Sequence, residues 1–316
     1  MTGLTVRVPA KLNLQLAVGP PRADGYHDLV TVFHAVSLFD EITAEPAASD
    51  GVSVRGEGAD QVPEDGDNLA LRAVAALRAA AAPADAGGVH ITIVKRIPVA
   101  AGLAGGSADA AAALVACNEL WDVGLGQPEL LEIAAGVGSD VAFALLGGTA
   151  VGRGRGERLT PALAPATPYH WVLAFAEGHL STPEVYGTLD RLRAAEAERS
   201  GRKRMPGPVL APALDGALMS ALRSADARQL GPALSNDLQP AALSLFPALR
   251  KTLAAGLELG ALGALVSGSG PTCMFLAASA DRALDLAASL SGAGVCRSVA
   301  RATGPVPGAA VVPTVR

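Results

Sequence analysis

Apolar and polar residues alternate along the first segment of the chain, residues 6–18. Successive side chains of a strand point to opposite faces, so this alternation predicts a strand with one apolar and one polar face. The apolar face carries Leu12, Leu14, Leu16 and Val18. The polar face carries Lys11, Asn13 and Gln15. Further strands are predicted near Ile42, at 52–54 and over 89–95, where Pro98 ends the last one.

Helical patterns fill the rest of the first half. A helix is predicted over 68–81, preceded by the acidic residues 64–67. The Gly-rich segment PVAAGLAGGS then leads into an Ala-rich helix predicted over 107–121. Two further helices are predicted over 128–137, where Gly138 ends the helix, and directly after Ser139-Asp140. Glycines at 147–148 and 152–156 mark turns.

The second half mixes helices and strands more evenly. Strands are predicted over 171–175 and 295–302, with a strand–turn–strand around VSGSGPTCMF. Helices are predicted over 182–195, 213–222, 243–259 and 282–290. The pattern predicts an α+β fold in two domains, 1–160 and 161–316, with the boundary placed by the distribution of motifs. The loop 200–212 and the Pro-rich tail from Gly304 receive no role.

Composition excludes several classes of protein. Only 3% of the 316 residues are aromatic although half are hydrophobic, so Ala, Val and Leu must supply most of the core. The net charge of −5 argues against a nucleic-acid surface, and the basic run 199–204 is interpreted as a solvated loop. No apolar run reaches the roughly 20 residues that span a bilayer. Three cysteines without CxxC spacing indicate a reducing cytoplasm, and no signal peptide is expected.

The Gly-rich loop is the strongest local signal for chemistry. Gly102, Gly105 and Gly106 lie between a predicted strand and a helix, with Ser107 at the junction. Glycines let a backbone approach a ligand closely, and the free N–H groups of a helix start attract anions. The segment matches neither a GxxxxGK[ST] loop nor a GxGxxG fingerprint. By itself it fits a tight turn with a Ser cap about as well as a phosphate site.

Three other features carry weaker signals. Lys11 with Asn13 fits an exposed strand face, although Tyr26, His27 and Phe33 follow closely in a chain poor in aromatics. Asp140 fits a helix cap, or alternatively a carboxylate that faces a lysine and takes a proton from a substrate hydroxyl. The turn 267–271, SGSGP, fits a plain hairpin loop or an anion contact through backbone amides.

In their order along the chain, these four segments resemble the GHMP superfamily of small-molecule kinases. The superfamily's Pro-x-x-x-Gly-Leu-x-x-Ser-type loop before a helix is similar to PVAAGLAGGSADAAA here. The N-terminal run with DGYH and TVF is similar to a superfamily member that acts on a cytidine-bearing substrate. VGSDVAF and SGSGPTCMF follow in the expected order, so the resemblance spans nearly the whole chain.

The resemblance implies an ATP-binding domain at 1–160, a substrate-binding domain at 161–316 and an active site in the cleft between them. It implies ATP and Mg²⁺ as cofactors and a catalytic pair formed by Lys11 and Asp140. The phosphate loop implied by the resemblance is Pro98, Val99, Ala100, Ala101, Gly102, Leu103, Ala104, Gly105, Gly106 and Ser107. Lys95 and Asn68 fall near the adenosine, and Ser107 is a candidate contact for the metal, for which no direct ligand is assigned.

For the acceptor, the resemblance implies the 2-hydroxyl of a cytidine-diphosphate-linked methylerythritol, an intermediate of non-mevalonate isoprenoid synthesis. The residues implied to hold its cytidine end are Tyr26, His27, Phe33, Pro183 and Tyr186. Asn13 lies beside the erythritol, and Gly268 and Ser269 match a second glycine-rich turn. Asp140 takes or orients the hydroxyl proton, and Lys11 keeps Asp140 ionised. The alternatives are another GHMP kinase, for mevalonate, homoserine or a sugar, and a non-catalytic binding protein on the same scaffold.

This chain departs from the family pattern at two places. Ala100, Ala101 and Ala104 stand where many members have glycine, which predicts a stiffer loop. GSDVA replaces the commoner Gly-x-Asp-Val-Pro at residues 138–142, which affects how the helix after Asp140 begins.

Overall fold

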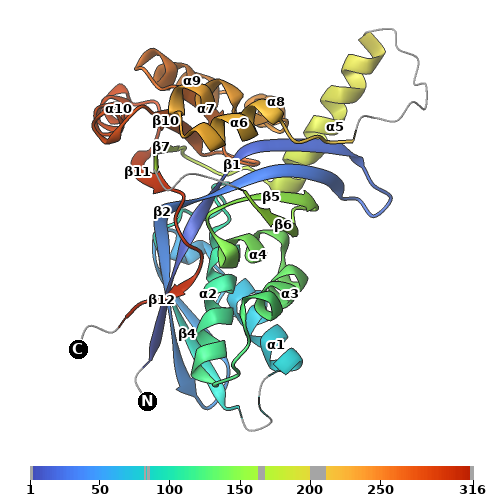
Figure 1. The fold of residues 1–316 in the computed structure, drawn as a ribbon, viewed down its shortest axis with the longest axis vertical. Helices are drawn as coiled ribbons and strands as arrows, with labels where there is room; N and C mark the ends of the chain where they lie inside the picture. Colours follow the sequence, from blue (N-terminus) through green and yellow to red (C-terminus); the bar gives the residue numbers. More distant parts are fainter. Residues whose placement is uncertain (1–2, 82, 84–85, 163–167, 200–210, 314–316) are drawn as a thin grey trace.

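The computed structural model describes residues 3–81, 83, 86–162, 168–199 and 211–313. Most of the loop 200–212 and of the basic run 199–204 therefore lies outside the described residues; Arg199 is the last residue of a helix. The described chain forms two sheets with helices packed around them (Figure 1). Among the described residues no helix is both long and apolar enough to cross a membrane.

The larger sheet is built on a long antiparallel pair. Its strands follow the order β12 (Ala310–Val311), β1 (Leu4–Pro21), β2 (His27–Ala47), β4 (Gly88–Lys95) and β3 (Gly51–Gly56). Off this path, β5 (Thr149–Gly154) pairs with β2 and with β6 (Arg158–Pro161), and β8 (Ser235–Asn236) pairs with β1. The sheet thus recruits strands from the chain's second half.

The β1–β2 pair bends along its length. Its register shifts at three places, between Pro9 and Ala10, between Asn13 and Gln15, and between Val18 and Pro21. Such bulges increase the local twist and redirect side chains, and they are frequent beside active sites. The outer part of the hairpin extends beneath helix α5 (Thr182–Arg199), so an arm of the larger sheet lies against a helix of the second half (Figure 1).

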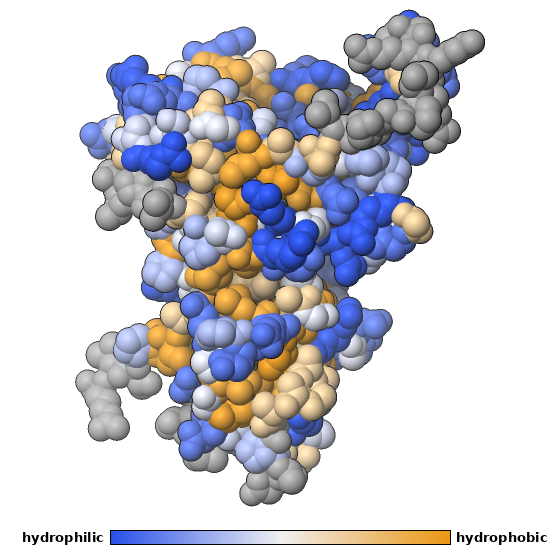
Figure 2. Space-filling view, turned by 45° about the vertical axis from the view of Figure 1, so that its right-hand side comes forward, coloured by the Kyte–Doolittle hydropathy of each residue, from blue (hydrophilic) through white to orange (hydrophobic). Residues whose placement is uncertain are grey.

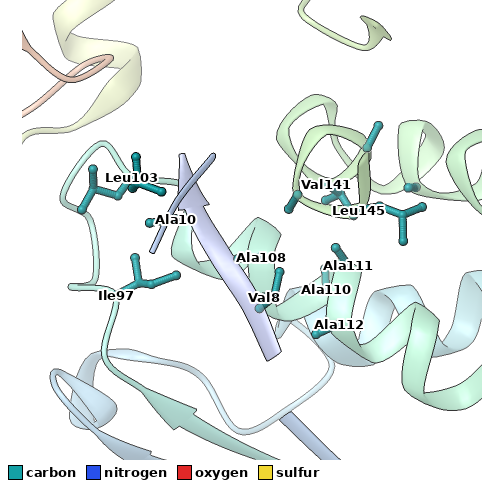
Figure 3. Packing of buried hydrophobic residues seen from close by; sticks show 14 of the residues in the cluster. Val8, Ala10, Ile97, Leu103, Ala108, Ala110, Ala111, Ala112, Val141 and Leu145 are labelled. Atoms are coloured by element: carbon teal, nitrogen blue, oxygen red, sulfur yellow. The ribbon is translucent and has the colours of Figure 1, made fainter. Parts of the chain in front are cut away.

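Helices of the first half pack on this sheet through small side chains. They are α1 (Leu69–Ala81), α2 (Gly105–Leu120), α3 (Gln127–Val137) and α4 (Ser139–Leu146), with a short 3-10 turn at Ala59–Gln61. The alanines of α2, including Ala108, Ala110 and Ala111, are almost fully buried, which allows close approach in a core with few aromatics. Figure 3 shows these alanines between Val8 of β1 and Val141 of α4.

The smaller sheet is buried on both faces. Its order is β11 (Ser298–Gly304), β7 (Tyr169–Phe175), β10 (Cys273–Ala277) and β9 (Gly263–Val266). Trp171 and Leu173 of β7 join one apolar cluster, and Val172 and Ala174 join another, as strand alternation requires. The helices of this half are α5, α6 (Gly216–Ser224), α7 (Ala227–Ala233), α8 (Gln239–Leu245), α9 (Leu249–Glu258) and α10 (Ala280–Ala293).

Several predicted elements differ from the structure. The helix predicted over 243–259 is wrong, because α8 ends at Leu245 and α9 begins at Leu249. Pro247 disfavours a helical conformation at Phe246, whose φ of −132° and ψ of 77° end α8. The Ala-rich helix begins at Gly105 and not at Ser107. Residues 152–154 belong to β5, so only the part of GRGRGE after Gly154 turns.

The tail from Gly304 has a clear position. Val306 N donates to Ala35 O, and β12 pairs with β1, so the chain returns to the larger sheet at its end. On the face drawn in Figure 2, apolar side chains reach the surface along the middle of the molecule, with hydrophilic residues on both sides.

The division of the chain into two domains, residues 1–160 and 161–316, stays a prediction.

Candidate active site

A cavity of about 1240 Å³ lies among the described residues. Its walls come from β1, β2, the Gly-rich loop, the α3–α4 junction, α5 and the turn 267–271. Predicted site residues that line it are Lys11, Asn13, Tyr26, His27, Phe33, Ala100, Ala101, Gly102, Ala104, Gly105, Gly106, Ser107, Asp140, Pro183, Tyr186, Gly268 and Ser269. The structure therefore collects residues from four separate segments around one space.

Lys11 and Asp140 form an ion pair at this cavity. The Lys11 Nζ lies 3.6 Å from Asp140 Oδ2, and the two side chains are 10% and 31% exposed. The same ammonium donates to Asn13 Oδ1 at 2.7 Å, and Asn13 Nδ2 donates to Thr31 Oγ1 at 2.8 Å. This chain of hydrogen bonds fixes the direction of the lysine. The carboxylate of Asp140, which is more exposed than the Lys11 side chain, stays accessible to a ligand.

Asp140 does not cap its helix. The residue at the N-cap of α4 is Gly138, which has an extended conformation, and no side chain makes a capping hydrogen bond there. Asp140 lies in the first turn, where a negative charge interacts favourably with the helix dipole. The Asp140 carboxylate therefore does not serve as a helix cap, which was one of the two roles that the sequence allowed.

Two glycine-rich turns pack directly against each other. Ser267 Oγ donates to Gly102 O at 3.1 Å, and Lys11 N donates to Leu103 O at 3.2 Å. Gly102 has a φ of +76°, and a Cβ on it would lie 2.3 Å from Ser267 O. Only glycine fits this position, because any side chain would meet backbone. The loop is therefore held between β1 and the turn 267–271.

The second turn also needs a glycine. Gly268 has a φ of +56°, and a Cβ there would lie 3.2 Å from Asn13 Oδ1 and 3.6 Å from Lys11 Nζ. Its neighbour Ser269 is linked to Thr182, with 2.9 Å between the two hydroxyl oxygens. The turn thus connects the lysine with the start of α5.

The Gly-rich loop strains two alanines. Ala100 and Ala104 have φ angles of 51° and 59°, in the left-handed region that alanine rarely adopts. Gly105 and Gly106 are the first residues of α2, where no positive φ is required. The first intrahelical bond that follows the loop runs from Ala108 N to Ala104 O, so the preceding amides lack helical partners. A helix start of this kind attracts an anion.

Some predicted ATP contacts do not reach the cavity. The Leu103 side chain is 1% exposed and packs towards Ala10 and Ile97 in Figure 3. Pro98 and Val99 do not line the cavity either. Asn68 is buried, and its Oδ1 accepts from Ala70 N at 2.9 Å at the start of α1. The contacts of these four residues with ATP stay a prediction, since they do not line this cavity.

The ammonium of Lys95 forms two ion pairs beneath the Gly-rich loop. Its Nζ donates to Asp40 Oδ2 at 2.5 Å and to Asp109 Oδ2 at 2.8 Å, and all three side chains are buried. A Cβ on Gly105 would lie 3.0 Å from this ammonium. Two carboxylates hold the ammonium, and the position of Lys95 near the adenosine stays a prediction.

Burial governs the protonation of this group of three. Burial raises the pKa of Asp109 to about 8, against the opposing charge of Lys95. Burial also lowers the pKa of Lys95, but the two carboxylates outweigh this and raise it above its ordinary value. The raised pKa values favour a protonated Lys95 and a protonated Asp109 in this buried group. The sequence showed Asp109 near the phosphate loop, and the structure turns it into the core.

The far end of the cavity is aromatic. The rings of His27 and Tyr186 lie 5.0 Å apart between centroids, and the Arg155 guanidinium lies 4.7 Å from the centroid of Tyr26. Tyr26 is 54% exposed, so this ring is available to a ligand. Burial raises the pKa of Tyr186, helped by the charge of Asp140, and the phenol stays neutral.

Phe33 lies at the other end of the cavity. It pairs with Asn13 in the register of β1 and β2, whereas His27 pairs with Pro21. Six residues of strand span about 20 Å, so Phe33 and His27 lie at well-separated places along the wall of the cavity that both residues line. The Phe33 ring stacks on Phe143 at 4.8 Å and lies 5.3 Å from Lys11 Nζ. The ring of Phe33 thus lies beside Lys11, and its contact with the cytidine end stays a prediction.

Sequence reasoning missed several residues that line the cavity, among them Thr31, Arg155, Thr182 and Asp190. Thr31 could have been found, because it lies two residues from Phe33, which pairs with Asn13 in the register of β1 and β2. Asp190 and Arg155 carried no signal, since their elements are placed at the cavity only by tertiary packing.

Comparison with known proteins agrees with this geometry. The model of the GHMP kinases N terminal domain matches residues 68–148, and that of the GHMP kinases C terminal matches residues 218–296. The chain belongs to the GHMP kinases. A kinase of this class moves a phosphoryl group from ATP to a small molecule.

Closer relatives narrow the family. A 4-diphosphocytidyl-2-C-methyl-D-erythritol kinase of Nocardia farcinica is 58% identical over 97% of this chain and 95% of that protein. The protein of the same name from Thermobifida fusca is 57% identical over 98% and 99%. Within the GHMP kinases, the chain belongs to the 4-diphosphocytidyl-2-C-methyl-D-erythritol kinase family.

Solved structures show the same likeness. A crystal structure of 4-(cytidine 5'-diphospho)-2C-methyl-D-erythritol kinase is 35% identical, with a TM-score of 0.72 over 94% of this chain and 98% of that one. A homoserine kinase from Cytophaga hutchinsonii reaches a TM-score of 0.75 at 22% identity, over 99% and 98%. The second comparison shows a shared fold alone.

Proposed function

We propose that this kinase transfers the γ-phosphoryl group of ATP to the 2-hydroxyl of 4-diphosphocytidyl-2-C-methyl-D-erythritol, a step of isoprenoid precursor synthesis. The observation that carries the proposal is the Lys11–Asp140 ion pair, 3.6 Å long, on the wall of a cavity shared with the Gly-rich loop. The names of the relatives that cover nearly the whole chain support the choice of acceptor.

Asp140 acts as the general base. Its carboxylate accepts the proton of the 2-hydroxyl while that oxygen attacks the γ-phosphorus, and the bond between this phosphorus and the bridging oxygen of ADP breaks. Lys11 stabilises the charge on the transferring group, and its hydrogen bond to Asn13 keeps it aimed. Asn13 lies beside the erythritol part of the acceptor. A positioned base is worth about 10²-fold to 10⁴-fold in rate.

ATP binds along the Gly-rich loop with its phosphates at the start of α2. The amides of residues 105–107 and the helix dipole face the negative charge. When bound, Mg²⁺ would neutralise charge on the phosphates. The Ser107 hydroxyl lines the cavity and would be an oxygen ligand for an ion that prefers phosphate oxygens and few protein ligands. Among the described residues no group of three or more acidic, His or Cys side chains forms a metal site.

The cytidine end of the acceptor binds at the aromatic end of the cavity. Tyr26 offers an exposed ring face, and His27 and Tyr186 form the wall behind it. Stacking of a base on an aromatic ring is worth about 1–3 kcal/mol. Pro183, Gly268 and Ser269 border the path from this end to the catalytic pair.

The remaining parts of the proposal concern the setting of the enzyme. Residues 1–160 form the ATP-binding domain and 161–316 the substrate-binding domain. Cytoplasmic location is supported by three free cysteines, two of them buried. The partner is a small molecule and not a nucleic acid, in line with the net charge of −5.

The proposal is tested by identifying the product. The protein is incubated with ATP, Mg²⁺ and 4-diphosphocytidyl-2-C-methyl-D-erythritol, and the product is examined by ³¹P and ¹³C NMR. A new phosphomonoester coupled to carbon 2 is expected, together with ADP. A phosphate on another hydroxyl, or ADP formed without a phosphorylated acceptor, would contradict the proposal.

A further inference from the structure

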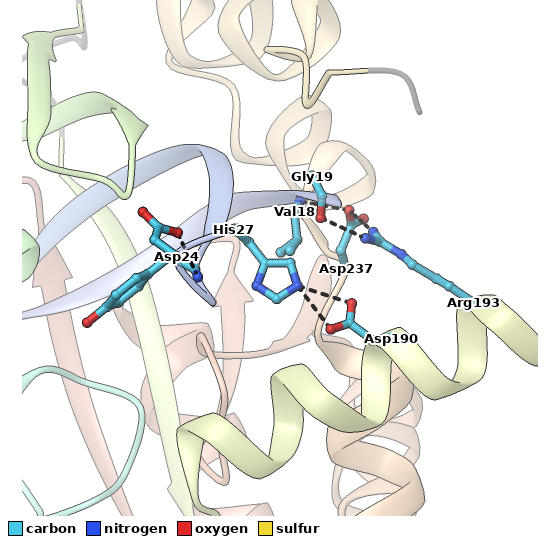
Figure 4. Close-up of polar contacts among 8 residues, drawn as sticks. Val18, Gly19, Asp24, His27, Asp190, Arg193 and Asp237 are labelled. Atoms are coloured by element: carbon cyan, nitrogen blue, oxygen red, sulfur yellow. Dashed lines mark hydrogen bonds and ion pairs between the residues drawn. The ribbon is translucent and has the colours of Figure 1, made fainter. Parts of the chain in front are cut away.

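His27 and Asp190 form a contact that joins the β1–β2 hairpin to α5. The His27 Nε2 lies 3.1 Å and 3.2 Å from the two carboxylate oxygens of Asp190. The His27 side chain is 6% exposed and that of Asp190 33%. Both residues line the large cavity at its aromatic end. Figure 4 shows the Nε2 edge of the ring facing Asp190 on α5, with the other ring nitrogen turned away.

This contact fixes which ring nitrogen carries the proton. An ionised carboxylate only accepts hydrogen bonds, so Nε2 must donate and must carry the hydrogen. In the neutral ring, Nδ1 then has a free lone pair and is an acceptor. The Nδ1 atom of His27 has no hydrogen-bond partner among the described residues, and it is not fully buried. It therefore remains within reach of a ligand in the cavity.

We infer that Asp190 is a positioning residue that holds His27 as an acceptor and so makes the site select an amino-bearing pyrimidine. The inference rests on the proposed function. Cytosine carries an amino group at position 4, which can donate to Nδ1. Uracil carries a carbonyl oxygen there, which would face another acceptor, and a mismatch of this kind is penalised because a buried polar group stays unpaired. Asp190 touches His27 and acts through it.

The same helix offers a matched control. Arg193 donates to Gly19 O at 3.2 Å and to Asp237 Oδ2 at 2.9 Å, and Asp237 accepts from Val18 N at 2.9 Å. These contacts also join α5 to the hairpin, as Figure 4 shows, but they do not involve His27. Arg193 does not line the cavity. Replacing Arg193 therefore loosens the docking of α5 and leaves the His27–Asp190 contact in place.

The test compares Asp190→Asn and Arg193→Met with the unaltered protein. The acceptors are 4-diphosphocytidyl-2-C-methyl-D-erythritol and its uridine counterpart, and the readout is the ratio of their kcat/KM values. The ratio should fall about tenfold or more in Asp190→Asn, as expected for loss of one directed hydrogen bond. The ratio should stay unchanged in Arg193→Met, and the KM for ATP should stay unchanged in both.

A second measurement needs no substrate. The ¹⁵N shifts of His27, recorded by NMR at about pH 8, where an ordinary histidine is neutral, should show a proton on Nε2 in the unaltered protein and in Arg193→Met. Asp190→Asn should lose this fixed tautomer, because an amide can donate to Nε2 as well as accept from it. A proton on Nδ1 in the unaltered protein would overturn the inference, as would an unchanged ratio in Asp190→Asn or an equal fall in Arg193→Met. Failure of the unaltered protein to phosphorylate the cytidine compound would instead refute the proposed function, while the tautomer would still be decided by NMR.

Discussion

The ammonium of Lys11 lies 3.6 Å from the carboxylate of Asp140, although one residue is on the first strand and the other at the start of α4. The pairing depends on the packing of α4 beside β1 and α2, a contact between elements far apart in the chain. Asp140 makes no capping hydrogen bond, and both residues line the cavity. The pair is therefore the feature of the cavity most directly tied to chemistry.

Replacing Asp140 by Asn tests the base. Asn keeps the size of the side chain but cannot accept the hydroxyl proton, so kcat should fall by about 10²-fold to 10⁴-fold. The melting temperature should change little, because Asp140 makes no capping hydrogen bond. Steady-state kinetics and a thermal melt of the same preparation provide both numbers.

Lys11→Met is the companion variant. It should lose comparable activity yet bind ATP, measured by calorimetry. A large drop in melting temperature for Asp140→Asn together with a nearly normal kcat would show that the carboxylate is structural.

Gly102 should tolerate no side chain. Gly102→Ala forces a Cβ towards Ser267 O, 2.3 Å away, at a φ of +76°. The expected loss is about 1–3 kcal/mol in the free energy of unfolding, the usual cost of such strain. Gly106→Ala is the control for stability, because a Cβ there meets only Leu69 Cδ1 at 3.5 Å. It should be neutral or stabilising by up to about 1 kcal/mol, since Ala is the better helix former. Equal denaturant midpoints for the two variants would contradict the packing of the two turns.

Asp109 should give stability a distinctive dependence on pH. Its pKa is raised from 3.8 to about 8 in the folded protein, chiefly by burial. The folded state therefore holds a proton that the unfolded chain has lost, and this contribution to stability falls as pH rises through that interval. The limit for one proton is about 1.4 kcal/mol per pH unit.

Asp109→Asn removes the titrating group and keeps its shape. The difference in unfolding free energy between the two proteins, measured by urea titration from pH 5 to about 8, should change steadily, with the unaltered protein losing stability towards high pH. A difference that is constant with pH would mean that Asp109 is ionised in the fold.

Tyr26 should matter for the acceptor and not for ATP. Its ring is 54% exposed, so Tyr26→Ala should fold normally. Loss of base stacking should raise the KM for the cytidine substrate about tenfold or more, because 1.4 kcal/mol is a factor of ten. The KM for ATP is measured alongside as the control. An unchanged acceptor KM would move the cytidine site away from this end of the cavity.

Local patterns predicted much of this fold. The alternation in residues 6–18 and the Ala-rich helix after the Gly-rich loop are both present, because each depends on short-range periodicity and on glycine. Pro247 indicated that a helix should end before it, but the continuous apolar pattern over 243–259 favoured the prediction of a single helix. The length of β2, 21 residues, was missed because its two halves meet different neighbours and show no single pattern.

The sequence predicted which residues line the cavity better than it predicted the contacts that these residues make. Lys11, Asp140 and the glycines of the loop meet at one cavity. The contacts of Lys95 with Asp40 and Asp109 and of Phe33 with Phe143 could not be predicted, because proximity along the chain says nothing about which buried carboxylate or which ring a side chain meets. Asp190 gave no sequence signal, since its partner His27 lies in a distant segment and only the docking of α5 brings them together.

The central claim is that the acceptor is the cytidine compound, and a panel of acceptors tests it most directly. ADP release is measured with 4-diphosphocytidyl-2-C-methyl-D-erythritol, mevalonate, homoserine and galactose under the same conditions. The account predicts a kcat/KM for the cytidine compound that exceeds the others by orders of magnitude. Comparable turnover of mevalonate, homoserine or galactose would contradict it.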